Sequence, residues 1–108
     1  MSAETRYADL AQKMQRNGAV THVTEGKGFG SSGQLKVDGR IFAMLVRGEL
    51  VLKLSRQRVD ELIAGGDGRH FDAGKGKPMR EWFVLSTTSG KRWLPLAEEA
   101  MEFVKEAK

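Results

Sequence analysis

The 108-residue chain contains no cysteine, only two histidines and two prolines, and no apolar run long enough to cross a bilayer. Without cysteine it has no disulfide framework, no thiol nucleophile and no zinc-thiolate site, and two histidines alone cannot complete a metal cage. We therefore expect no cofactor and no bound metal. Because the first residues include an acid and lack the apolar core of a signal peptide, we expect a cytoplasmic protein with no membrane contact.

The chain has the size and the 40% hydrophobic content of one folded domain, which we place at residues 1–108. Its net charge of +4 is unevenly distributed. Residues 18–93 contain thirteen Lys and Arg against eight Asp and Glu, whereas residues 94–108 contain two against four. A basic middle can attract phosphates or nucleic acid, although an ordinary solvated surface has the same composition.

Three segments show the apolar spacing of amphipathic helices. The first covers residues 3–14, the second follows a candidate N-cap at Ser55 and ends at Gly65-Gly66, and the third begins near Pro95.

Five segments have the composition or the alternation of strands: residues 20–24, 35–37, 41–46, 50–54 and 81–86. Asp38-Gly39 suits a type I′ hairpin, because both residues tolerate a positive φ, and Arg47-Gly48 turns the chain again. The order α-β-β-β-β-α-β-α contains no βαβ repeat. We therefore expect an α+β, two-layer domain in which an antiparallel sheet of four to six strands carries helices mainly on one face.

Residues 41–46 and 82–85 are apolar on both faces of their strands, so the second face of the sheet needs a cover. Either one helix crosses to that face or two copies of the chain meet there. In the second case Phe42, Met44 and Val46 are the candidate dimer face, and we expect a homodimer.

The loop at residues 26–33 matches GxGxxG, the spacing that lets backbone amides approach a pyrophosphate. Lys27, Gly28 and Gly30 are therefore candidate phosphate contacts. However, a dinucleotide site needs a helix directly after the glycines, and here strands follow. The alternative is a tight turn that needs glycine for backbone reasons.

A second basic segment places Lys75, Lys77 and Arg80 just before Trp82. Lysines that neutralise phosphates beside a ring that stacks on a base make a candidate nucleic-acid contact. The alternative is an ordinary solvated loop with Trp82 in the core.

Catalytic patterns are weak. Ser31 and Ser32 do not fit a GxSxG elbow, and neither histidine lies in a triad motif, so we predict no catalytic residues. His70 with Asp67 and Asp72 is a loose candidate metal site or an ordinary polar loop.

Several motifs in order resemble the N-terminal domain of the TfoX (Sxy) competence-regulator family. They are Phe29-Gly30 with Gly33, the hairpin at residues 37–43, the strand at residues 49–54, and Gly76-Lys77-Pro78-Met79-Arg80 before Trp82. Members commonly have Met-Phe-Gly-Gly at the start of the loop, where this chain has Gly28-Phe29-Gly30-Ser31.

The resemblance implies a fold similar to type III secretion chaperones, often paired as a dimer, and supplies no catalytic residues. Full-length members are linked to natural competence and transcriptional activation, but they carry a C-terminal helical domain for which this chain has no counterpart. We expect a non-enzymatic regulatory or protein-interaction module with an unidentified protein partner. The alternative is nucleic-acid or nucleotide binding through the basic Gly/Lys loops.

Overall fold

The computed structural model describes residues 3–16, 18–23, 34–46, 48–71, 79–86 and 92–106. Its elements in chain order are α1 (Ala3–Met14), β1 (Val20–Val23), β2 (Gln34–Val37), β3 (Arg40–Val46), β4 (Glu49–Lys53), α2 (Arg56–Ala64), β5 (Gly68–Phe71), β6 (Met79–Leu85) and α3 (Trp93–Glu106).

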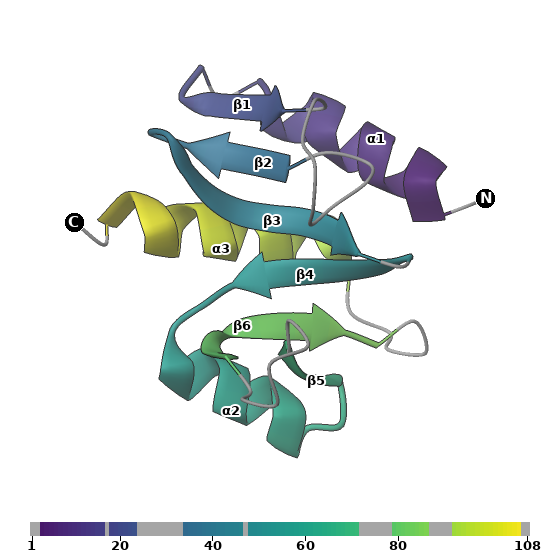
Figure 1. Ribbon diagram of the computed structural model, residues 1–108, viewed down its shortest axis with the longest axis vertical. Helices are drawn as coiled ribbons and strands as arrows, with labels where there is room; N and C mark the ends of the chain where they lie inside the picture. Colours follow the sequence, from purple (N-terminus) through teal and green to yellow (C-terminus); the bar gives the residue numbers. More distant parts are fainter. Residues whose placement is uncertain are drawn as a thin grey trace.

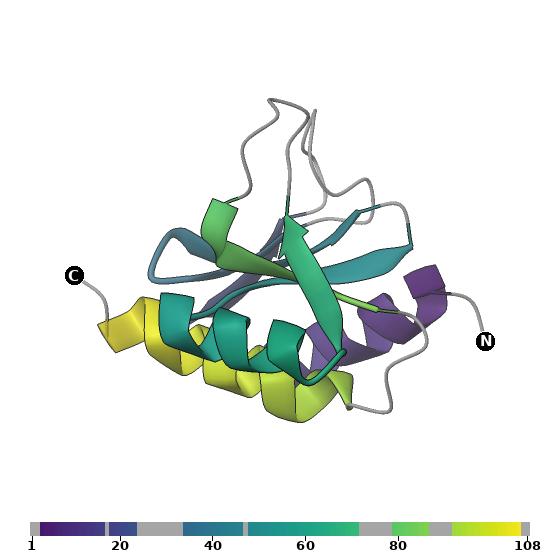
Figure 2. The same cartoon turned by 90° about the horizontal axis from the view of Figure 1, so that it is seen from below.

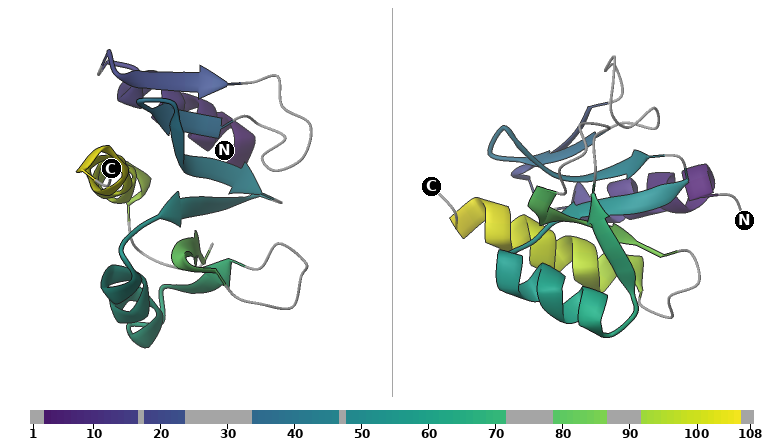
Figure 3. Two further views of the ribbon diagram at one scale, coloured as in Figure 1. Left: turned by 60° about the vertical axis from the view of Figure 1, so that its left-hand side comes forward. Right: turned by 60° about the horizontal axis from the view of Figure 1, so that its bottom comes forward.

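The strands form one six-stranded sheet in the order β1-β2-β3-β4-β6-β5, and every neighbouring pair is antiparallel (Figure 1). Helices α1, α2 and α3 all lie on one side of this sheet (Figure 2). The α+β class and the two-layer arrangement are therefore confirmed. The structure adds β5, a short edge strand within the region that the sequence suggested as a polar loop; β1 forms the opposite edge (Figure 3).

Local signals produce the turns and caps that the sequence predicts. Asp38 and Gly39 both have positive φ, 52° and 81°, as a type I′ turn requires. Ser55 caps α2, since its side-chain oxygen accepts a hydrogen bond from the Arg58 amide at 3.1 Å. The same helix ends in a Schellman motif: the Asp67 amide donates to the Leu62 carbonyl and the Gly66 amide to the Ile63 carbonyl.

The main core lies between the sheet and the helices. α3 packs across β2, β3 and β4, α2 packs on β5 and β6, and α1 contacts α3. Tyr7 of α1 is fully buried in this core, and its hydroxyl donates a hydrogen bond to the Ala43 carbonyl at 3.4 Å. Burial raises the pKa of that hydroxyl well above its usual range. Tyr7 is therefore a neutral structural anchor between α1 and β3.

A bulge in β3 changes which residues face the helices. Lys36 pairs with Ile41 and Leu35 pairs with Ala43, which leaves Phe42 as the extra residue. Both Phe42 and Ala43 consequently belong to the helix-side core, whereas Met44 and Val46 lie on the second face. The prediction that Phe42, Met44 and Val46 share one face is wrong for Phe42, because the bulge interrupts the strict alternation on which that prediction depended.

The second face of the sheet holds a smaller cluster of buried side chains. Met44, Val51, Phe71 and Val84 form it, with Val46 and Trp82 packed at its border. Met44 is only 4% exposed and Val51 is fully buried within a single chain. No helix among the described elements crosses to this face (Figure 2). Since Met44 is already buried, this face is not the open apolar patch that we expected for a dimer contact.

Candidate functional site

Most residues of the expected phosphate or nucleic-acid site lie outside the described part of the chain: Lys27, Gly28, Gly30, Lys75 and Lys77. Arg80 lies in β6, but its side chain also falls outside the description. The site therefore remains a prediction from the sequence. Of the expected metal group, His70 faces α2, where its Nε2 lies 3.6 Å from Asp60 Oδ1, and Asp72 is outside the described residues.

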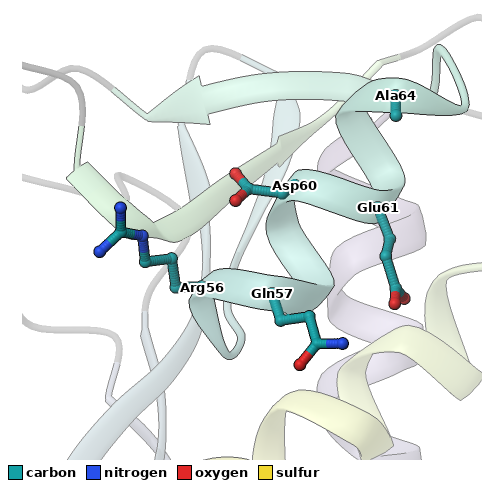
Figure 4. Close-up of a pocket in the computed structure, with 5 residues that line it drawn as sticks. All are labelled: Arg56, Gln57, Asp60, Glu61 and Ala64. Atoms are coloured by element: carbon teal, nitrogen blue, oxygen red, sulfur yellow. The ribbon is translucent and has the colours of Figure 1, made fainter.

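One surface hollow follows the outer side of α2 (Figure 4). Its lining is Arg56, Gln57, Asp60, Glu61 and Ala64. Figure 4 shows Arg56 and Asp60 extending to one side of the helix and Gln57 and Glu61 to another, so these groups do not meet at a common point. The two carboxylates already have partners, since Asp60 is near His70 and Glu61 lies 3.4 Å from Arg58. This hollow is a charged helix surface without the convergent geometry of a reaction site.

A second hollow, of about 320 Å³, lies between α1 and the start of α3. We call it the α1–α3 hollow; its lining is Arg6, Asp9, Leu10, Lys13, Arg92, Trp93, Leu94 and Pro95. Three of these residues are basic and only one is acidic. Leu10 is buried, Leu94 is half-buried and Pro95 is exposed, so apolar surface lies among the charges. The hollow thus combines positive charge with apolar lining residues.

The basic side chains of the α1–α3 hollow differ in whether they have an acidic partner. The Lys13 ammonium lies 3.0 Å from Asp9, one helical turn away, in an exposed ion pair. Within the described ranges no carboxylate pairs with Arg6 or with Arg92. Instead, the Arg6 guanidinium carbon stands 4.3 Å from the centroid of the Trp93 ring. A cation–π contact at this distance restrains the guanidinium group beside the ring.

Two other arginines form ion pairs that connect elements of the fold. Arg58 donates from Nε to Glu99 at 2.8 Å, which ties α2 to α3, and this hydrogen bond raises the pKa of Arg58. Arg69 donates to both carboxylate oxygens of Glu49, at 2.7 and 3.0 Å. This bidentate pair reaches from β5 to β4 across β6, and the hydrogen bonds from Arg69 lower the pKa of Glu49. Both pairs connect neighbouring elements of the fold.

Sequence reasoning did not identify Arg6, Arg92 and Trp93. Arg6 lies in α1 and Trp93 opens α3, so the two meet only because α1 and α3 pack together. The available signal was the adjacent pair Arg92-Trp93, a basic residue beside an aromatic one at the start of a helix.

Within the described residues, no three His, Asp or Glu side chains are grouped closely enough to hold a metal ion. No helix there has both the length and the apolar character needed to span a membrane.

Comparisons with known protein families, with characterised proteins and with solved structures found no match for this chain.

Proposed function

We propose that this chain is a non-enzymatic protein-interaction module that contacts its partner through the α1–α3 hollow. The observation that carries the proposal is the hollow itself, in which Arg6 and Arg92 border apolar surface and Arg6 is held by Trp93. Binding surfaces combine anchoring apolar contacts with charged groups at the rim in this way.

The proposal includes a place in the TfoX N-terminal domain family and a regulatory role of that type. The antiparallel sheet with three helices on one side supports it, since the resemblance implies such a fold. Self-association remains part of the proposal. Because Met44 and Val51 on the second face of the sheet are buried within one chain, we no longer propose that face as the dimer contact.

Site-specific photo-crosslinking in cells of the source organism tests the interaction. A photoreactive benzophenone residue replaces Leu94 inside the hollow, and the control places it at Gln57 in the α2 hollow. We expect a discrete adduct from position 94 that disappears when Arg6→Glu is added, and no such adduct from position 57. Adducts of equal yield at both positions, or none at position 94, would refute the proposed contact surface.

Nucleic-acid or nucleotide binding through Lys75 and Lys77 stays the alternative. It predicts binding of a short DNA that weakens steeply with salt and is reduced in the Lys75→Ala, Lys77→Ala variant. Unchanged binding in this double variant, or no binding at low salt, would remove the alternative.

A further inference from the structure

We infer that the partner segment recognised by the α1–α3 hollow is an acidic peptide with one apolar anchor. Carboxylates of the segment pair with Arg6 and Arg92, while the anchor enters the hollow beside Leu94. This inference rests on the proposed function, since it assigns a chemistry to the partner of the same surface.

Charge complementarity is the first step. The hollow has three basic side chains and one acidic one, and Asp9 is already committed to Lys13. Arg6 and Arg92 are exposed, so a ligand can reach both guanidinium groups. The α2 hollow, by contrast, has one basic and two acidic side chains, so it would not attract the same ligand. The two helix surfaces therefore differ in the sign of the partner they favour.

The stacking of Arg6 favours a carboxylate over a nucleic-acid base. The guanidinium at 4.3 Å occupies one face of the Trp93 ring, where a base would otherwise stack. The N–H edges of the guanidinium match the two oxygens of a carboxylate. Because the ring already restrains the side chain, less conformational freedom is lost when the ligand binds. Arg6 is thus prepared for a planar, bidentate anion.

The size and apolar lining of the hollow favour an apolar anchor. At about 320 Å³ it lies at the lower end of the ~300–1,000 Å³ typical of ligand pockets. The half-buried Leu94, the exposed Pro95 and the buried Leu10 all lie in its lining. One apolar side chain of a peptide can cover this surface and exclude water from the adjacent ion pairs, which strengthens them.

Fluorescence anisotropy with defined peptides tests the inference. The probe is a fluorescein-labelled octapeptide with a central Leu-Phe flanked on each side by three acidic residues. Matched probes replace the acids by lysine or the Leu-Phe by Ser-Ser, and a dT12 oligonucleotide represents nucleic acid. At low salt we expect the acidic probe to bind at least about tenfold more tightly than either the lysine probe or dT12, and several-fold more tightly than the Ser-Ser probe.

Protein variants then locate the site. Arg6→Ala and Arg92→Ala should each weaken the acidic probe about tenfold, the loss expected for one charge-assisted pair, while Arg56→Ala in the α2 hollow should leave the affinity unchanged. Arg6→Lys keeps the charge but loses the planar fork, so an intermediate loss is expected. Far-ultraviolet circular dichroism of each variant checks that the helices are intact.

Three results would overturn the inference: equal binding by wild type and Arg6→Ala, tighter binding of dT12, or no binding of the acidic probe up to millimolar concentration. Sedimentation analysis that shows a wild-type dimer and a monomeric Arg6→Ala variant would also overturn it. The α1–α3 hollow would then bind a second copy of the chain. If the crosslink at position 94 persists while the acidic probe fails, the interaction surface stands and only the partner chemistry is wrong.

Discussion

The two faces of the sheet differ in how they are closed. The helix-side core includes residues from all three helices and from β1, β2, β3, β4 and β6, and the three helices cover it. Among the described residues, the buried members of the second-face cluster come from β3, β4, β5 and β6. Charged side chains of the same strands are also paired: Arg69 of β5 pairs with Glu49 of β4, and the Lys53 ammonium lies 5.7 Å from the Trp82 ring. In the described part of the chain, one face is thus a continuous core and the other holds a smaller apolar cluster.

This difference shows that burial on both faces does not make the faces equivalent. Among the described residues, those that face the helices belong to a core shared by elements far apart in the sequence, whereas those on the second face belong to a cluster drawn from four strands. Truncations of buried side chains on the two faces should therefore have unequal effects on the free energy of unfolding.

Phe42→Ala should have the largest effect. The side chain is fully buried in the helix-side core, so its loss removes apolar contacts and leaves a cavity. We expect a decrease of about 3–5 kcal/mol in the free energy of unfolding, measured by urea denaturation. A decrease below that found for Met44→Ala would contradict the ranking of the two faces.

Met44→Ala, two residues further along β3, is the matched change on the second face. We expect a decrease of about 2–3 kcal/mol, because Met44 is buried but belongs to the smaller cluster. Light scattering should give the same mass for the variant and the wild type. If this face instead joins two copies, the variant will also lower the mass measured by light scattering.

Gly68→Ala tests the packing of the edge strand β5. An added Cβ would lie 2.6 Å from Phe83 Cζ and against the Val84 carbonyl oxygen, so β5 would have to move away from β6. Overpacking of this kind lowers stability by about 1–3 kcal/mol. Gly18→Ala is the control, because the space around Gly18 is open and no positive φ is required. Equal midpoints for the two variants in thermal denaturation would contradict the predicted crowding.

Glu49→Gln should have the smallest effect, and that effect should depend on pH. The hydrogen bonds from Arg69 lower the pKa of Glu49 in the folded chain, so the pair stabilises the fold above the pKa of the unfolded carboxyl. This contribution is lost as the pH falls through the folded pKa. Because Arg69 is 62% exposed, we expect less than ~1 kcal/mol at pH 7.

Urea denaturation of wild type and Glu49→Gln between pH 7 and pH 3 measures the difference. The two stabilities should converge toward the acidic end of the range. The Glu102→Gln variant, exposed on α3, serves as the control. A Glu49→Gln variant that is more stable than the wild type at pH 7 would mean that the charge of Glu49 destabilises the fold.

Sequence reasoning succeeded where the determining interactions are local. The Asp38-Gly39 turn and the Ser55 cap depend on the residues themselves and on neighbours a few positions away. The bulge at Phe42 was not predictable, because residues 41–46 are all apolar and no polar residue marks the change of face. β5 was missed because Gly68 and Arg69 give little strand signal and the strand depends on pairing with β6.

The candidate site was harder to predict than the fold. Arg6 and Trp93 are far apart in the sequence, and neither residue belongs to a recognisable motif. Their stacking follows from the packing of α1 against α3, a tertiary contact that no local pattern encodes. The glycine and lysine motifs that did attract attention lie outside the described residues.

The position of α3 has a consequence for folding during synthesis. This helix covers β2, β3 and β4 and also contacts α1, yet it is the last of the described elements to leave the ribosome. Until it emerges, the helix-facing side of the central strands lacks its main cover. Exposed apolar strands are prone to aggregation. A nascent chain that stalls before Trp93 would therefore be a target for chaperones that bind apolar segments, whereas the completed chain would be released.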